Sequence, residues 1–135
     1  MSEIKNTKTF IAELVASFPE IIDDVLDENN LGFISLQIGC FRRFTQEAIN
    51  GYDLNTVKKC IAFADANFET TEWEVTNSLS ISFVGKLDFS KNRSAEKLLT
   101  DKLTGVRSQL DLYYNSLSKD EKLNKFLKDL GQDQS

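Results

Sequence analysis

The scarcity of chain-breaking residues is the feature that most constrains this fold. Only one Pro and six Gly occur among 135 residues, whereas an all-β domain of this size needs many turns rich in Gly, Pro, Asn and Asp. The length suits one domain, and a chain that is 41% hydrophobic with ten Phe can form a sizeable core. We therefore expect an all-α, compact single domain spanning residues 1–135.

Apolar residues recur along most of the chain at the spacing of an amphipathic helix. They predict about six or seven helices, stacked as antiparallel pairs, over approximately 8–18, 19–29, 32–49, 55–68, 75–87, 95–116 and 119–131. Residues 1–7 and 132–135 are expected to be disordered. Thr7, Asp53 or Asn55, and Ser94 are the predicted N-caps.

Two predictions concern helix interiors. The third helix should bury one stripe of side chains, namely Phe33, Leu36, Cys40, Phe41, Phe44 and Ala48. Gly39 lies in the middle of that helix, where glycine costs roughly 1 kcal/mol relative to alanine, so it is expected to mark a close contact between helices.

Residues 75–84 allow two interpretations. The run from Ser78 to Phe83 alternates between polar and apolar residues, which is typical of a strand. Helical spacing also fits, because Val75, Leu79, Phe83 and Leu87 form one ridge. No partner strand is visible elsewhere, and an isolated strand cannot satisfy its backbone, so a helix is favoured.

The net charge of −5 is unevenly distributed. Residues 1–90 carry seven basic and fourteen acidic side chains, whereas residues 91–135 carry nine basic and seven acidic ones. No Lys or Arg occurs from Phe10 to Leu36, or from Cys60 to Gly85. Such a chain should repel nucleic acid, whose binding depends on clustered Lys and Arg, and attract a basic partner. An acidic surface that serves only solubility is the alternative.

The residue types argue against catalysis. The chain has no His, which removes the commonest general base and metal ligand, and its single, scattered glycines form no phosphate-binding loop. The i, i+4 pairs Asp23–Asp27 and Asp24–Glu28 could hold a divalent cation, but an exposed acidic helix face is the commoner arrangement. We therefore predict no enzyme activity, metal or cofactor.

The two cysteines and the termini bear on location. Cys40 and Cys60 lie in apolar stretches, where free thiols behave as small buried hydrophobes. No stretch of roughly 18 apolar residues predicts a membrane span, and residues 1–8 lack the apolar core of a signal peptide. A cytoplasmic location without membrane contact is expected.

Exposed acids and aromatics are the candidate partner-binding residues. Trp73, a residue type favoured as an interface anchor, stands between acids at the start of a predicted helix. Those acids could instead compensate the helix dipole, with Trp73 folded onto the domain. Tyr113 and Tyr114 point in different directions on a helix, so one can be core and the other exposed. The full candidate set is Asp23, Asp24, Asp27, Glu28, Asp65, Glu69, Glu72, Trp73, Glu74, Asp111 and Tyr114.

Two segments resemble a known family. Thr9-Phe10-Ile11-Ala12-Glu13-Leu14 leading to Phe18-Pro19-Glu20, and the run from Glu74 to Val84, are similar to a family of small, acidic, all-helical bacterial domains of unknown function. The resemblance covers roughly residues 8–90, and such proteins are similar to immunity proteins of contact-dependent growth inhibition and other polymorphic toxin systems.

The resemblance implies a cytoplasmic antitoxin. It would bind one cognate toxin protein, a basic nuclease being the expected kind, and block its active site, but it supplies no catalytic residues. The alternative is a helical adaptor or regulatory domain in a signalling or transcription complex. The oligomeric state is left open.

Overall fold

The computed structural model describes residues 4–113 of the chain, and within them the domain is all-α, with no β-strand. Its α-helices are α1 (Thr7–Ser17), α2 (Ile22–Val25), α3 (Ile34–Asn50), α4 (Leu54–Asn67), α5 (Trp73–Ser78), α6 (Arg93–Glu96) and a helix over 101–113. Shorter turns are η1 (Pro19–Ile21), the π-helical η2 (Leu79–Phe83) and η3 (Val84–Lys86). The all-α prediction is confirmed.

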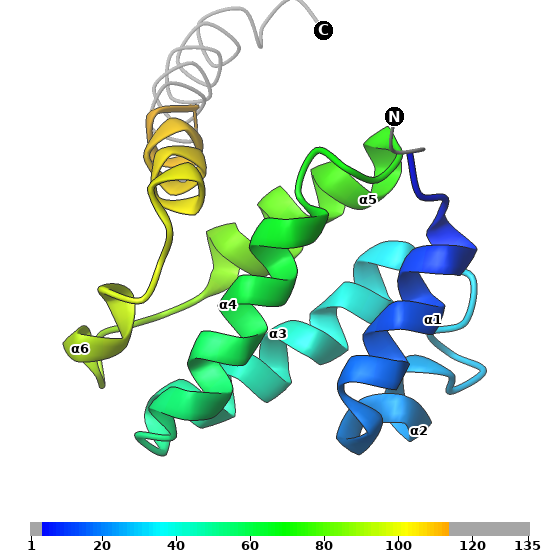
Figure 1. Ribbon diagram of the computed structural model, residues 1–135, viewed down its shortest axis with the longest axis horizontal. Helices are drawn as coiled ribbons and strands as arrows, with labels where there is room; N and C mark the ends of the chain where they lie inside the picture. The colour runs from blue at the N-terminus through cyan, green and yellow to red at the C-terminus, as the bar shows by residue number, and fades with distance from the viewer. Residues whose placement is uncertain (1–3, 114–135) are drawn as a thin grey trace, which may run out of the picture.

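Helix α3 is the centre of the domain. It packs against α2, α4, α5 and η2, and Figure 1 shows α1 and α2 on one side and the 101–113 helix on the other. Four aromatic rings join these elements: Phe41 of α3 stacks on Phe83 of η2 at 4.5 Å between centroids, and also packs against Phe18 and Phe63. One continuous core therefore joins the elements from α1 to η2.

Several local signals act as predicted. Pro19 occupies the first position of η1, where its missing N–H costs nothing. Asp53 caps α4 by accepting a hydrogen bond from the N–H of Thr56. At α1 the prediction is wrong by one residue, because Asn6, and not Thr7, accepts the capping bond from the N–H of Thr9.

The ambiguous segment is helical. Leu79 and Phe83 are fully buried within η2. The serines find partners that suit a helix: Ser80 Oγ donates to the carbonyl of Thr76, and Ser78 lies 3.1 Å from Ser35 of α3 between hydroxyl oxygens. The strand alternative is therefore wrong, and α5 with η2 forms the helical run that was favoured.

The buried stripe of α3 is rotated relative to the prediction. Phe33, just before the helix, is 61% exposed and Leu36 is also exposed, while Gln37 and Thr45 are buried. Both polar side chains are satisfied, because Gln37 Nε2 donates to the carbonyl of Val25 and Thr45 Oγ donates to that of Phe41. α2 covers the Gln37 side of α3, which leaves Leu36 outside, while Phe33 precedes the first turn of the helix.

Helix boundaries differ at two further places. The predicted helix over 19–29 is α-helical only from Ile22 to Val25 and continues as turns. Gly32 lies in that connection with φ +85°, so α3 begins at Ile34 rather than at Gly32. A side chain at Gly39 would meet only the guanidinium of Arg43, at 3.8 Å, so Gly39 marks no close helix contact.

The predicted helix over 95–116 is also broken. α6 ends at Glu96, and a new helix begins at residue 101. Thr100 caps it by accepting from the N–H of Leu103, while Ser94 is not a cap. Tyr113 is exposed, although the choice of Tyr114 as the partner-binding tyrosine implied that Tyr113 would be the one in the core. The predicted helix over 119–131 and the predicted disorder at 132–135 lie outside the described residues.

Candidate protein-binding surface

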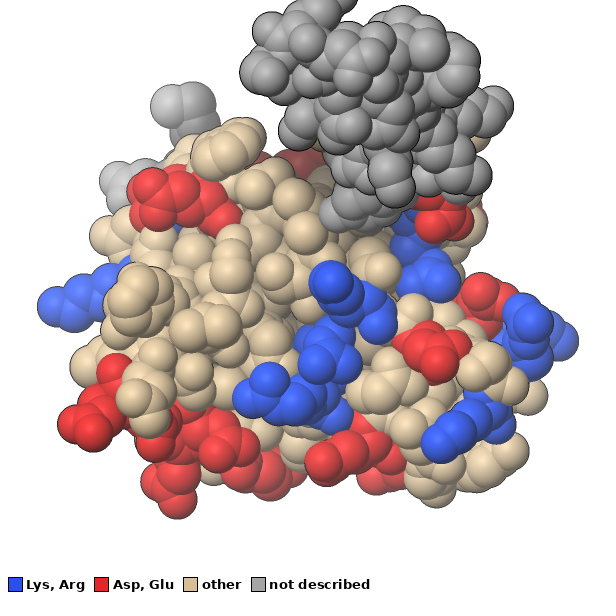
Figure 2. All heavy atoms as spheres, turned by 180° about the vertical axis from the view of Figure 1, so that it is seen from behind, with Lys and Arg blue, Asp and Glu red and all other residues tan. Residues whose placement is uncertain are grey.

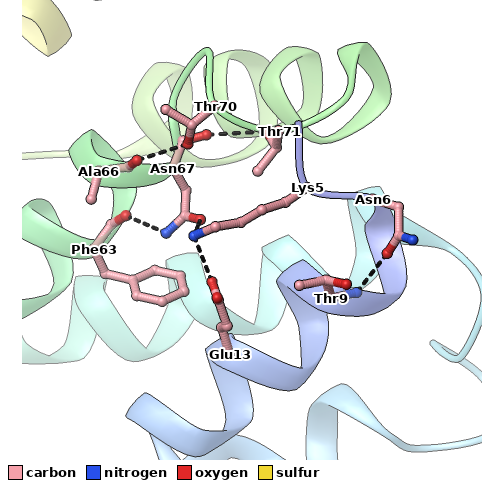
Figure 3. Close-up of polar contacts among 9 residues, drawn as sticks. All are labelled: Lys5, Asn6, Thr9, Glu13, Phe63, Ala66, Asn67, Thr70 and Thr71. Atoms are coloured by element: carbon pink, nitrogen blue, oxygen red, sulfur yellow. Dashed lines mark hydrogen bonds and ion pairs between the residues drawn. The ribbon is translucent and has the colours of Figure 1, made fainter. Parts of the chain in front are cut away.

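An N-terminal tether holds α1 in place. Lys5 pairs its backbone with Thr70 and Glu72, and its ammonium contacts Glu13 Oε2 at 2.7 Å and Asn67 Oδ1 at 3.1 Å. Figure 3 shows this side chain bridging α1 and the end of α4. Lys5 is therefore ordered, unlike the frayed terminus expected for residues 1–7.

A groove lies between α1 and the connection from α2 to α3. We call it the α1–α2 groove; its volume is about 590 Å³. Its lining is mainly apolar and consists of Ile11, Ala12, Val15, Leu26, Leu31 and Gly32. Two of its three polar residues have partners inside the fold, since Gln37 bonds to Val25 and Thr7 to Glu72. The third, Lys8, is exposed.

Exposed hydrophobic side chains extend this apolar surface. Leu31 is 55% exposed. Ile22 lies one helical turn before Leu26, and Phe33 one turn before Gln37, as the backbone bonds between these residues show. Ile22 and Phe33 are both exposed. Contiguous exposed apolar surface on a small protein marks an interaction site.

Four acids lie on α2 and the turn after it, the segment that also supplies Leu26 to the groove lining. This α2 acidic cluster consists of Asp23, Asp24, Asp27 and Glu28, all predicted partner-binding residues. One of them, Asp24, lines a separate pocket together with Cys40 and Arg43. All four are exposed, and none makes an ion pair with any residue from 4 to 113. Asp27 Oδ1 accepts from the N–H of Asn29, which stabilises the turn. Figure 2 shows acidic side chains gathered along the lower edge, where α2 lies.

The segment around Trp73 divides into outward and inward residues. Trp73 is 75% exposed, so it is not folded onto the domain, and Glu69 and Glu74 are also exposed. Glu72, by contrast, accepts hydrogen bonds at 2.8 Å from the N–H and the hydroxyl of Thr7. Both bonds lower the pKa of this carboxyl, the bond from the N–H by more than the bond from the hydroxyl. Glu72 therefore links α5 to α1.

The remaining candidates lie apart from the groove. Asp65 Oδ1 accepts a 2.7 Å hydrogen bond from Thr100 Oγ, which ties α4 to the start of the 101–113 helix. Asp111 is exposed on that helix, on the opposite side of the molecule from α2 in Figure 1. Tyr114 lies outside the described residues.

Among residues 4–113, no three or more His, Cys, Asp or Glu side chains come together as a metal site would require. Cys40 and Cys60 are free and buried, as predicted, and burial raises the pKa of the Cys60 thiol to about 11. No helix in the described range is long and apolar enough to cross a membrane.

The groove is the feature that sequence reasoning missed. Its signal was present in Leu31-Gly32-Phe33, where two large apolar residues flank a glycine inside a predicted connection. Large apolar side chains in a connection stabilise a protein only when they are buried, either in the fold or against a partner. A search for helical periodicity does not find them, because they lie between helices.

Comparison with known protein families identifies the family of this chain. The family model for a domain of unknown function, DUF7674, matches residues 11–128. The chain belongs to this family. In this DUF7674 domain the matched region includes most of α1, all of the α2 acidic cluster, and Trp73. The domain matches no curated protein and no solved structure.

Proposed function

We propose that this DUF7674 domain is an immunity protein, which binds one cognate bacterial toxin protein and blocks its active site. The observation that carries the proposal is the α2 acidic cluster, whose four exposed carboxylates have no ion-pair partner within residues 4–113 and lie on the segment that also supplies Leu26 to an apolar groove. A basic protein surface would supply the missing countercharges.

The energetics of such an interface favour a protein partner. Exposed carboxylates speed encounter with a basic surface and fix its orientation, while apolar side chains provide most of the affinity once buried. Trp73 offers a second anchor, linked to α1 through Glu72 and Thr7. A basic nuclease fits these features, because its active site must itself attract phosphate.

A growth assay tests the proposal. The gene immediately upstream would be expressed as the candidate toxin, alone and together with this domain, and toxin activity would be measured in the purified mixture. We expect growth arrest by the toxin alone and full rescue by the domain. The absence of a toxic neighbour, or toxicity that the domain does not relieve, would remove the immunity function and favour the adaptor alternative.

Charge variants locate the interface in the same assay. Asp23→Asn with Asp27→Asn should weaken rescue, whereas Asp101→Asn with Asp111→Asn, on the 101–113 helix, should not. Each pair shifts the net charge from −5 to −3, so the comparison separates position from total charge. Equal rescue by the two pairs would contradict the assignment to α2.

A further inference from the structure

The α1–α2 groove lacks groups that could bind a peptide backbone. Its apolar walls come from α1 and the connection at Leu26 to Gly32, and Thr7 and Gln37 already bond to Glu72 and Val25. An extended peptide needs a sheet edge or other polar groups for its own N–H and C=O groups. A helix satisfies its backbone internally, so it can present only apolar side chains to such a groove.

The size of the groove admits either several apolar side chains or a small molecule, so its polar groups decide between them. Its volume of about 590 Å³ lies in the range of sites that enclose a drug-sized ligand. Sites for small molecules add a few placed polar groups, whereas two of the three polar residues here bond within the fold and only Lys8 is left. Ile22 and Phe33, each one helical turn from a groove residue, are also exposed, which favours a longer occupant.

Charge complementarity selects among apolar occupants. The α2 acidic cluster lies on the segment that supplies Leu26 to the groove, and its carboxylates have no ion-pair partner among the described residues. These acids disfavour a fatty-acid anion or an anionic lipid surface. They also disfavour a second copy of the chain, because a two-fold interface would bring the same acids together.

We infer that the α1–α2 groove binds an amphipathic helix of the partner protein that carries two or three large apolar side chains on one face and Lys or Arg on the flanks. Its apolar side chains enter between Ile11, Val15, Leu26 and Leu31, and its basic side chains meet the α2 acidic cluster. This inference deepens the proposed function and rests on it for the identity of the partner, but not for the existence of the site.

Designed peptides test the groove directly. The probe is a labelled helical peptide with Leu at i, i+3, i+4 and i+7 and Lys elsewhere, titrated with the full chain by fluorescence anisotropy. The comparison peptides are a scrambled Leu/Lys sequence and a peptide with Glu in place of every Lys. We expect the amphipathic Leu/Lys peptide to bind, and the other two to bind at least about ten-fold more weakly.

A matched pair of variants ties binding to the groove. Leu31→Ser should weaken peptide binding by about ten-fold or more. Leu112→Ser, at a residue that is also exposed (70% against 55% for Leu31) but lies on the 101–113 helix, should leave binding unchanged. Neither substitution alters charge, and both residues are exposed, so both variants should keep the wild-type melting curve.

Three results would overturn the inference: equal binding of all the peptides, no effect of Leu31→Ser, or a dimer in sedimentation that Leu31→Ser dissociates, since a second copy would then occupy the groove. Failure of the groove site and failure of the proposed function can be told apart. If the peptide binds selectively but the domain neutralises no toxin, only the immunity function is wrong. If the domain neutralises a toxin but Leu31→Ser weakens neither neutralisation nor peptide binding, only the groove site is wrong.

Discussion

The carboxylate of Glu72 accepts two hydrogen bonds from Thr7, and both cross from the start of α5 to the start of α1. A carboxylate that accepts from a backbone N–H is a stronger acceptor than a neutral amide. Together with the backbone pairing of Lys5, these bonds fix the helix that forms one wall of the α1–α2 groove. Glu72, which was predicted to bind a partner, thus stabilises the contact between α5 and α1.

The stability of the domain should therefore depend on pH through Glu72. Its pKa lies below the ordinary value of 4.5, so the ionised form is favoured in the folded state. This contribution is complete above about pH 4.5 and is lost as the pH falls through the lower, folded-state pKa. Glu72→Gln should lower the melting temperature at pH 7, and the difference from wild type should shrink below pH 4.5.

The adjacent Glu74 is the matched control. It is exposed and has no hydrogen-bond partner among residues 4–113. Glu74→Gln should therefore leave the melting temperature unchanged at either pH, measured by circular dichroism. Equal shifts for the two variants would mean that net charge, and not the bonds to Thr7, sets the effect.

At the scale of elements, the 101–113 helix docks on η3 and on the residues that follow it. Arg107 Nη1 donates at 2.9 Å to the carbonyls of both Val84 and Leu87, and its guanidinium lies over the ring of Phe89. At Gly85 the approach is close: a Cβ there would lie 3.0 Å from Leu110 Cδ1 and 3.1 Å from the carbonyl oxygen of Ser80. Gly85, rather than Gly39, is thus the glycine at a close contact.

Alanine substitutions at these two glycines should therefore change the free energy of unfolding in opposite directions. Gly85→Ala should destabilise the domain by about 1–3 kcal/mol, because the backbone of Ser80 cannot yield as a side chain does. Gly39→Ala should stabilise it by roughly 0.5–1 kcal/mol, since it removes a glycine from a helix interior where space is free. Urea unfolding measures both; a stabilising Gly85→Ala would contradict the close approach.

At the scale of the whole molecule, charge and apolar surface are arranged together. α2 buries Val25 towards α3 and turns its acids outward, so the acidic stretch without Lys or Arg becomes one edge of the domain. The same segment supplies Leu26 to the α1–α2 groove, on the side of the molecule opposite the 101–113 helix. A basic partner is thereby directed towards a side that also offers apolar contact.

Association with the partner should depend on salt accordingly. We expect the association rate constant to fall by about ten-fold between 50 and 500 mM NaCl, because salt screens the exposed carboxylates, while dissociation changes little. Asp23→Asn with Asp27→Asn should flatten this dependence in stopped-flow or surface-binding measurements. Asp101→Asn with Asp111→Asn should retain it, and a rate insensitive to salt in the wild type would exclude electrostatic steering.

Local signals were sufficient for much of this fold. Pro19 starts η1, Asp53 caps α4, and the chain turns after α3 at Gly51, each because the conformation depends on neighbours within a few residues. The break between α6 and the next helix was missed because Thr100 makes both a local and a distant contact. Its hydroxyl oxygen accepts the capping bond from the N–H of Leu103, and the same hydroxyl donates to Asp65, 35 residues away in the chain.

Periodicity, chain breakers and charge are local properties, so the sequence was enough to predict the helical class, the number of helices among residues 4–113 to within about one, and the excess of acids over the first 90 residues. Which side chains face outward depends instead on contacts between helices. Gln37 is buried and Leu36 exposed because α2 covers one side of α3 and not the other. The groove and the inward role of Glu72 depend likewise on contacts between segments far apart in the chain, which no local pattern contains.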